Sequence, residues 1–319
     1  MHLQKLTRRN AITRAGLLAG AAVAGHHLPS TAAANDSVSN AAQSPFRFCL
    51  NTATIRGQKL GIVKEIEIAS QAGYDAIEPW VESIEAYVKS GAKLSDLKKQ
   101  IEDHGLTVES AIGFPEWIVD DDNRRAKGME RARREMDTVK QLGGRRFASP
   151  PAGATELPKL EFGRAVERYR ALLEIGDQIG IVPQLELWGF SKNLNRLGEC
   201  IGVAMETGHP KACVLADVFH LYKGGSDFRG LRLLRGDAIQ VLHMNDYPND
   251  PPAEKINDSY RVHPGEGTAP ITQILSLLKS MGGQKVLSLE LFNRNYWAEN
   301  ALEVAKTGLA KMKAVAQQA

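Results

Sequence analysis

The chain has 319 residues, of which 43% are hydrophobic, 24% charged and 6% aromatic, and its formal net charge is +3. This composition is typical of a globular protein and excludes a disordered or fibrous one. A small positive charge can indicate a nucleic-acid or membrane-surface partner, so its position along the chain matters.

The excess positive charge lies in the first 34 residues, which contain four basic residues and no acidic one. A weakly apolar run over residues 15–25 follows, and small residues then end in an Ala-x-Ala cleavage pattern at Ala34. Residues 7–12, with the pair Arg8-Arg9, resemble a twin-arginine export signal that lacks the usual aromatic residue. The alternative is a disordered tail or a membrane anchor, although 11 apolar residues are too few to span a bilayer.

Without residues 1–34 the chain holds 36 basic and 37 acidic residues, a net charge of −1. We therefore expect a signal peptide over 1–34, a linker over 35–45 and a domain over 46–319 that is exported to the periplasm. Such a domain has no basic footprint for a nucleic acid and is not expected to insert stably in a membrane. The three cysteines are odd in number and widely spaced, which favours buried thiols over disulfides or a zinc ribbon.

From residue 46 onward, short apolar runs alternate with amphipathic stretches. The runs that predict strands are 46–51, 74–78, 107–112, 146–149, 182–187, 213–217, 239–243 and 286–290. The stretches that predict helices are 62–72, 94–104, 123–142, 162–179, 194–206, 228–234, 271–281 and 298–315. Glycines stand where helices should end, at 73, 105, 143, 180, 208 and 282.

Eight strand and helix pairs without a Pro-rich or Ser-rich break predict an α/β fold, a single (β/α)8 barrel over 46–319. No Gly-x-Gly-x-x-Gly follows the first strand and no Walker loop is present, which argues against a doubly wound nucleotide-binding sheet. In a barrel of this kind the chemistry lies at the carboxyl ends of the strands.

Four consecutive strands, the fifth to the eighth, each end in a residue that can bind a metal: Glu186, Asp217, His243 and Glu290. A charged residue among the apolar residues of a buried strand costs free energy unless it is paired or coordinates an ion. One such residue is best explained by a salt bridge, but four at neighbouring strand ends indicate a metal site.

These residues, together with Asp217-x-x-His220 and Arg261-x-His263-Pro264-Gly265-x-Gly267, resemble the xylose isomerase-like barrels of the sugar isomerase and epimerase group. That group includes ketose 3-epimerases, hydroxypyruvate isomerases and inosose dehydratases, and is related to endonuclease IV. The resemblance covers about residues 46–316 and is specific for the superfamily rather than the substrate.

The resemblance implies that Glu186, Asp217, His243 and Glu290 are metal ligands, and that His220 and Arg261 contact substrate oxygens. Three carboxylates and one imidazole form an oxygen-rich site, so Mn²⁺ is the expected ion, with Mg²⁺, Co²⁺ and Zn²⁺ as alternatives. The trinuclear site of endonuclease IV is not expected, because its additional histidines are missing and Arg261 would repel a further metal.

A metal that bridges a ketone oxygen and the adjacent hydroxyl would stabilise the enediolate left when the neighbouring carbon loses a proton. Glu186 and Glu290 come from different strands and are the expected acid and base. We therefore expect an isomerase or epimerase acting on a sugar. The alternatives are a lyase or dehydratase acting on a keto-sugar, keto-inositol or 3-keto-glycoside at the same site, and an exported sugar-binding protein without turnover.

Aromatic residues that follow the strands are candidates for a sugar-binding wall: Trp80, Phe114, Trp117, Trp188, Phe190, Phe219, Tyr222 and Trp297. Trp188 is the first choice, since it comes directly after the Glu186 strand. Glu78 is expected to be a substrate contact or a structural ion pair. Export and the acidic residues of loop 245–268, Asp246 among them, favour an unphosphorylated sugar. The sequence is compatible with a homo-oligomer and does not define the oligomeric state.

Overall fold

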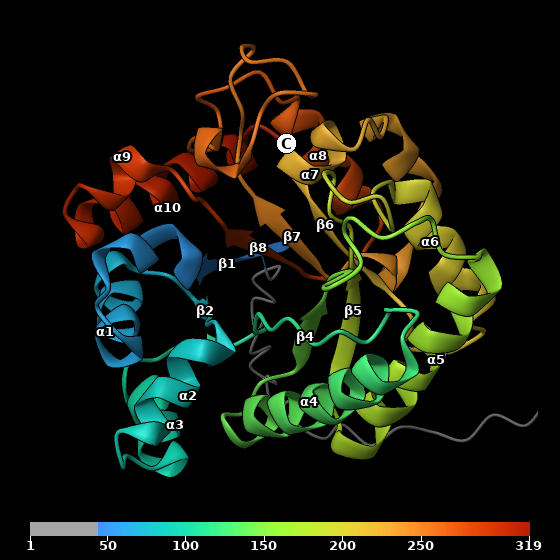
Figure 1. Ribbon diagram of the computed structural model, residues 1–319. Helices are drawn as coiled ribbons and strands as arrows, with labels where there is room; N and C mark the ends of the chain where they lie inside the picture. Colours follow the sequence, from blue (N-terminus) through green and yellow to red (C-terminus); the bar gives the residue numbers. More distant parts are fainter. Residues whose placement is uncertain (1–43) are drawn as a thin grey trace, which may run out of the picture. The chain divides into compact units, whose positions relative to one another are not determined.

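The computed structural model describes residues 44–319, and the predicted signal peptide therefore lies outside the described residues. Eight parallel strands occupy the centre of this part of the chain and the helices surround them (Figure 1). The strands are β1 (Phe46–Asn51), β2 (Ala76–Glu78), β3 (Thr107–Val108), β4 (Arg146–Ser149), β5 (Val182–Glu186), β6 (Val214–Asp217), β7 (Val241–Met244) and β8 (Lys285–Leu289).

The sheet order, β3-β2-β1-β8-β7-β6-β5-β4, follows the chain around a ring. Ile112 closes this ring, because it forms parallel bridges to Trp80 beyond β2 and to Ala148 of β4. The (β/α)8 barrel predicted from the sequence is confirmed, and β1 and β8 pair over five residues each at the point where the chain returns.

Ten α-helices are present among the described residues: α1 (Ile62–Ala72), α2 (Val81–Lys89), α3 (Leu94–Asp103), α4 (Asp122–Gln141), α5 (Phe162–Ile179), α6 (Leu197–Glu206), α7 (Val218–Lys223), α8 (Ile271–Ser280), α9 (Arg294–Trp297) and α10 (Ala301–Gln317). Four 3-10 helices accompany them: η1 (Thr52–Gln58), η2 (Phe228–Leu233), η3 (Gly236–Ala238) and η4 (Asp258–Tyr260). The six glycines predicted to end helices all have positive φ, which glycine adopts without strain.

Three α-helices were not predicted from the sequence, namely α2, α7 and α9, and one predicted helix has a different form. The helix α7 begins directly after β6, and the Asp217 side chain accepts a hydrogen bond from the backbone N–H of His220 to start it. No glycine or polar turn separates strand from helix, so the sequence pattern did not reveal it. The helix α2 follows Trp80 without a side-chain cap, and the short α9 precedes the predicted helix over 298–315. Residues 228–233 form the short η2 instead of an α-helix.

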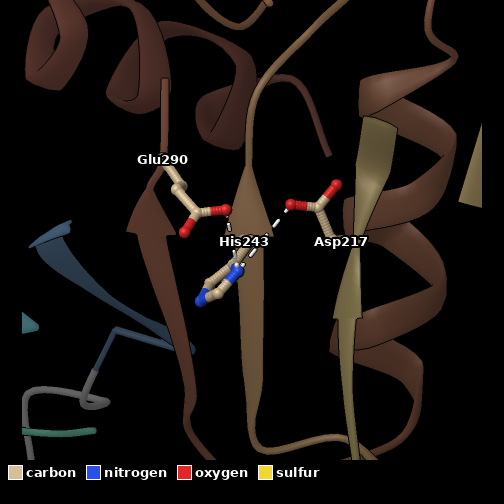
Figure 2. A group of neighbouring side chains, drawn as sticks. All are labelled: Asp217, His243 and Glu290. Atoms are coloured by element: carbon tan, nitrogen blue, oxygen red, sulfur yellow. Dashed lines mark ion pairs between the residues drawn. The ribbon is translucent and has the colours of Figure 1, made fainter. Parts of the chain in front are cut away.

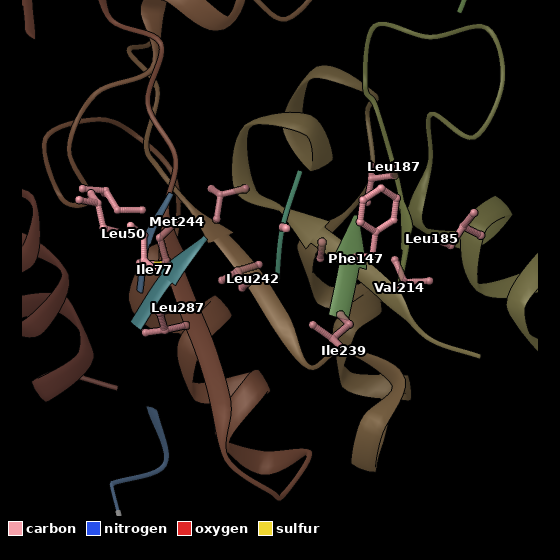
Figure 3. Close-up of a cluster of buried hydrophobic side chains, with 14 of the residues drawn as sticks. Leu50, Ile77, Phe147, Leu185, Leu187, Val214, Ile239, Leu242, Met244 and Leu287 are labelled. Carbon is pink, nitrogen blue, oxygen red and sulfur yellow. The ribbon is translucent and has the colours of Figure 1, made fainter. Parts of the chain in front are cut away.

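The largest apolar cluster lies between the strands and the surrounding helices. Outward-facing strand residues such as Leu50, Phe147 and Leu287 belong to it (Figure 3). Because alternate residues of a strand point to opposite faces, the residues next to these point the other way. Cys49 and Ala148 are examples, and they belong to a second, smaller apolar cluster. All three cysteines are free and buried, as the sequence predicts.

The strand register brings the predicted site residues to one level of the barrel. Asp217 of β6 is paired with His243 of β7, and His243 is paired with Ser288 of β8. Asn51 is paired with Glu78 at the ends of β1 and β2. Among residues 44–319, no helix combines the length and the apolar character needed to cross a bilayer.

Glu65 of α1 is a buried carboxyl group outside this site, and it makes stability depend on pH. The residue is 3% exposed, its Oε2 has no hydrogen-bond partner, and burial raises its pKa from 4.5 to about 7. Because the folded state holds the proton more tightly than the unfolded chain, stability falls as pH rises from about 4.5 to 7.

Glu65→Gln should therefore raise the free energy of unfolding at about pH 8, by up to about 3 kcal/mol, and have little effect near pH 4. Urea unfolding at the two pH values measures this difference. Glu67→Gln on the same helix is the control, since Glu67 pairs with Lys64 at the surface. An equal effect of Glu65→Gln at both pH values would contradict the assignment.

Candidate metal centre and active site

His243 lies at the centre of the site, fully buried on β7. Its Nε2 atom is 3.0 Å from Oε2 of Glu78, and its Nδ1 atom is 3.2 Å from Oε2 of Glu290. Oxygen atoms of Glu186 and Asp217 each lie 3.7 Å from the same Nδ1. Figure 2 shows the imidazole between Asp217 and Glu290. The four ligands expected from the sequence are therefore neighbours.

The protonation of His243 follows from its partners. An ionised carboxylate only accepts hydrogen bonds, so Nε2 donates its N–H to Glu78. Burial acts to lower the pKa of His243, but the carboxylates of Glu290 and Glu78 outweigh it and the pKa is raised. The Nδ1 atom is buried and makes no hydrogen bond, yet it faces three carboxylates. Nδ1 therefore lies where positive charge is favoured, either a proton on the ring or a cation that takes the place of that proton.

A divalent cation fits this arrangement. One ligand atom from each of Asp217, His243 and Glu290 lies within 4.8 Å of the others. Carboxylate oxygens and an imidazole nitrogen are donors that Mn²⁺, Mg²⁺, Co²⁺ and Zn²⁺ accept. Glu186, the fourth ligand expected from the sequence, lies outside this compact group of three, with its Oε1 3.7 Å from Nδ1 of His243.

Arg261 is the fixed positive charge of the site and is fully buried. Its Nη1 donates to Oδ2 of Asp217 at 2.7 Å and to Oε2 of Glu290 at 2.9 Å, and its Nη2 donates to Asp258 at 2.6 Å. Nη2 also lies 3.2 Å from Nε2 of His220. The guanidinium therefore holds two of the metal-ligand candidates and partly balances their charge.

Glu78 lies beside His243 rather than on the wall of a cavity. Its Oε2 accepts hydrogen bonds from Ser288 Oγ at 2.6 Å, from Asn51 Nδ2 at 3.0 Å and from His243. Of the two roles that the sequence left open, the geometry favours the structural ion pair over the substrate contact.

Two asparagines of the network were not found from the sequence. Asn51 donates to both Glu78 and Glu290, so it connects the residues on either side of His243. Asn245 donates to Oδ2 of Asp217 and accepts from the backbone N–H of Phe219. Both stand at strand ends, but an asparagine there carries no charge and gave no signal.

The buried carboxylates differ in their affinity for protons. Burial raises the pKa of Glu186 to about 8, and the nearby carboxylates of Glu290, Asp217 and Glu78 add to this although His243 opposes it. Burial also acts to raise the pKa of Glu290, but His243 and Arg261 outweigh it and the pKa is lowered. Environments that push two carboxyl pKa values apart are typical of an acid and base pair.

A cavity of about 230 Å³ adjoins the donor group. Glu186, Glu290, His220, Arg261 and Asp258 line its polar part. Aromatic rings line the rest, namely Trp80, Phe114, Trp188, Phe190 and Phe292, together with Ile112. Most predicted catalytic and substrate-binding residues therefore share one cavity, and Glu78 is the exception.

The aromatic candidates divide into two groups. Four of the candidates line the cavity: Trp80, Phe114, Trp188 and Phe190. Phe292 also lines it, although the sequence did not single it out. Four others do not line it: Trp117 and Phe219 pack in the core, Tyr222 stacks on Tyr247, and Trp297 donates its indole N–H to the backbone of Ala53.

Asp246, one of the acidic residues of loop 245–268, has a structural role that the sequence did not reveal. Its carboxylate accepts hydrogen bonds from the backbone N–H groups of four residues: Tyr247, Gly265, Gly267 and Ala269. The charge is thus used to fold the loop that carries Arg261. His263, on the same loop, stacks on Tyr296 and does not line the cavity.

A family model described as the xylose isomerase-like TIM barrel matches residues 66–315. The chain belongs to this family. The inosose isomerase of Bacillus velezensis is 26% identical over 84% of this chain and 96% of its own length. The 3-dehydroshikimate dehydratase of Pseudomonas putida is 23% identical over 80% of this chain and 40% of its own length. A solved structure of the IOLI protein with a bound zinc atom is 24% identical over 85% of this chain and 98% of its own, with a TM-score of 0.79.

If Glu78 orients His243, Glu78→Gln should weaken divalent-metal binding about 10- to 100-fold, the range found for partners of metal-binding histidines. Titration of the metal-free chain with Zn²⁺ against a chelating dye measures this. Ser288→Ala is the matched control, because it removes a donor to the same carboxylate but does not touch the imidazole. Equal metal affinity in Glu78→Gln and the unchanged chain would exclude the role.

Proposed function

We propose that this chain is a metal-dependent isomerase or epimerase that moves a proton on the carbon next to the carbonyl of a hydroxylated ketone, with a sugar as the substrate. The observation that carries the proposal is that Glu186 and Glu290, which come from different strands, line one cavity beside the group of Asp217, His243 and Glu290 that can hold a metal.

Asp217, His243, Glu290 and Glu186 would hold the metal, which supplies a Lewis acid for the carbonyl oxygen. Manganese remains our expected ion, while the bound zinc in the IOLI protein supports zinc as an alternative. Glu290 lines the cavity, and its carboxylate accepts hydrogen bonds from Arg261 and Asn51, which favour the ionised form that a base needs. Glu186 lies outside the compact ligand group and lines the same cavity, so it is placed to return the proton.

His220 and Arg261 complete the polar part of the cavity. Arginine has no lone pair to offer, so Nε2 of His220 must accept from Nη2 of Arg261, and the N–H of the neutral ring is at Nδ1. Burial, with Arg261 contributing, lowers the pKa of His220, which keeps the ring neutral. His220 therefore keeps one N–H group, at Nδ1, that makes no hydrogen bond and can donate to a substrate oxygen. The N–H groups of Arg261, in contrast, are donated to Asp217, Glu290, Asp258 and His220.

The names of the relatives support a hydroxylated ketone as the substrate, since an inosose is a cyclic polyol ketone. A dehydratase acting at the same site is the second candidate, supported by the relative named 3-dehydroshikimate dehydratase. A sugar-binding protein without turnover is less well supported, because binding alone does not need the two carboxyl groups. We further propose that the protein is exported to the periplasm. We also propose an unphosphorylated substrate, because the carboxylate of Asp258 in the cavity wall would repel a phosphate group.

Solvent-deuterium exchange tests the proposal. Loaded with Mn²⁺ or Zn²⁺, the chain should incorporate deuterium at the carbon next to the carbonyl of at least one ketose or inosose. Loss of water instead would indicate the dehydratase. Binding without exchange or elimination would contradict the enzyme assignment.

Glu290→Gln should lower the exchange rate about 10²- to 10⁴-fold, as expected for loss of a proton-transfer group. The variant also loses a ligand charge, so bound metal must be measured in the same sample. Glu254→Gln is the control and should leave the rate unchanged, because Glu254 is an exposed glutamate of the loop that follows β7. Full activity of metal-loaded Glu290→Gln would show that the base lies elsewhere.

A further inference from the structure

Five aromatic rings form a continuous wall on one side of the cavity, here called the aromatic collar: Trp80, Phe114, Trp188, Phe190 and Phe292. Neighbouring rings lie in contact, with centroids 6.1 Å apart for Phe292 and Trp80, 5.0 Å for Trp80 and Phe114, 5.9 Å for Phe114 and Trp188, and 5.2 Å for Trp188 and Phe190. They come from the segments that follow four different strands.

The collar is not explained by the proposed proton transfer. That chemistry uses the polar residues of the cavity, and a hydroxylated ketone alone would be matched by more hydrogen-bonding groups. The collar rings also differ from structural aromatics of the same region. Trp117 is 0% exposed in the core, whereas Phe190 is 43% exposed although it lies at the cavity. An aromatic ring left in water at a binding cavity indicates an apolar ligand surface.

The size of the cavity limits how the ligand is placed. Its volume of about 230 Å³ lies below the range of about 300–1,000 Å³ that is typical of sites for drug-sized ligands. A single hydroxylated ring fits within it. Any second part of the ligand must extend toward the exposed ring of Phe190, where it would meet an apolar surface.

Positive charge near the collar is already engaged. The Arg56 guanidinium lies 3.8 Å from the centroid of the Trp80 ring and also pairs with Glu82 at 3.6 Å. Arg261 is held by Asp217, Glu290 and Asp258. The groups around the cavity therefore do not favour an anionic substituent, and an uncharged one is the better match.

We infer that the substrate is a hydroxylated ring ketone that carries a flat, uncharged apolar substituent, such as the aryl group of an aryl glycoside. The ring lies on the polar residues and the substituent against the collar. This inference rests on the proposed function for the ring ketone, but the substituent is a statement about binding and can be tested without turnover.

The test compares matched pairs of 4-nitrophenyl and methyl glycosides of several sugars by isothermal titration calorimetry with the metal-loaded chain. At least one 4-nitrophenyl glycoside should bind tenfold or more tightly than its methyl partner. Phe190→Ala should reduce that ratio to about threefold or less, and Phe114→Ala should also lower it. Phe162→Ala is the control, because Phe162 is a similarly exposed phenylalanine that does not line the cavity.

Equal affinities within every pair would overturn the inference, as would failure of every aryl glycoside to bind. A preference for the aryl group that survives both collar substitutions would also overturn it. Proton exchange with a free sugar but no aryl preference would remove this inference and leave the proposed function intact. A preference for the aryl group without proton exchange on any ketone would support this inference and contradict the proposed function.

Discussion

Negative charge buried around His243 is the constraint on which the rest of the site depends. Four carboxylates, those of Glu78, Glu186, Asp217 and Glu290, are at most 4% exposed, and Arg261 is the one buried arginine among them. Removing such charges from water costs several kcal/mol per ion unless each is compensated. Arg261 and hydrogen bonds compensate part of this charge, and Nδ1 of His243, which faces three of the carboxylates, is the point where further positive charge is favoured, as a proton or as a metal. A divalent cation would supply the missing charge.

The fold holds this group together from several directions. Parallel strands place Asp217, His243 and Glu290 on three neighbouring strand ends, where their backbones are fixed by the ladder. Arg261 comes from a loop, and that loop is held by the Asp246 carboxylate and by the bridge between Asp246 and Val262. The rigid strands thus position the ligands, and the loops supply the cation and the aromatic collar.

Much of this could be predicted from the sequence because the signals are regular. The eight alternating segments revealed the barrel, and charged residues at four apolar strand ends revealed the donor set. The short helix α7 was missed, since it continues from β6 without a turn residue. Asn51 was also missed, and the sequence left two roles for Glu78, because both depend on which side chains the register of β1 and β2 brings beside His243. The use of Asp246 as a backbone acceptor had no sequence signal.

X-ray diffraction from crystals soaked in Mn²⁺ or Zn²⁺, recorded at the absorption edge of the metal, tests the central claim most directly. The account predicts one strong anomalous peak within bonding distance of Nδ1 of His243 and of the carboxylates of Asp217 and Glu290. Absence of a peak there, with the Arg261 guanidinium still bonded to both carboxylates, would contradict the account.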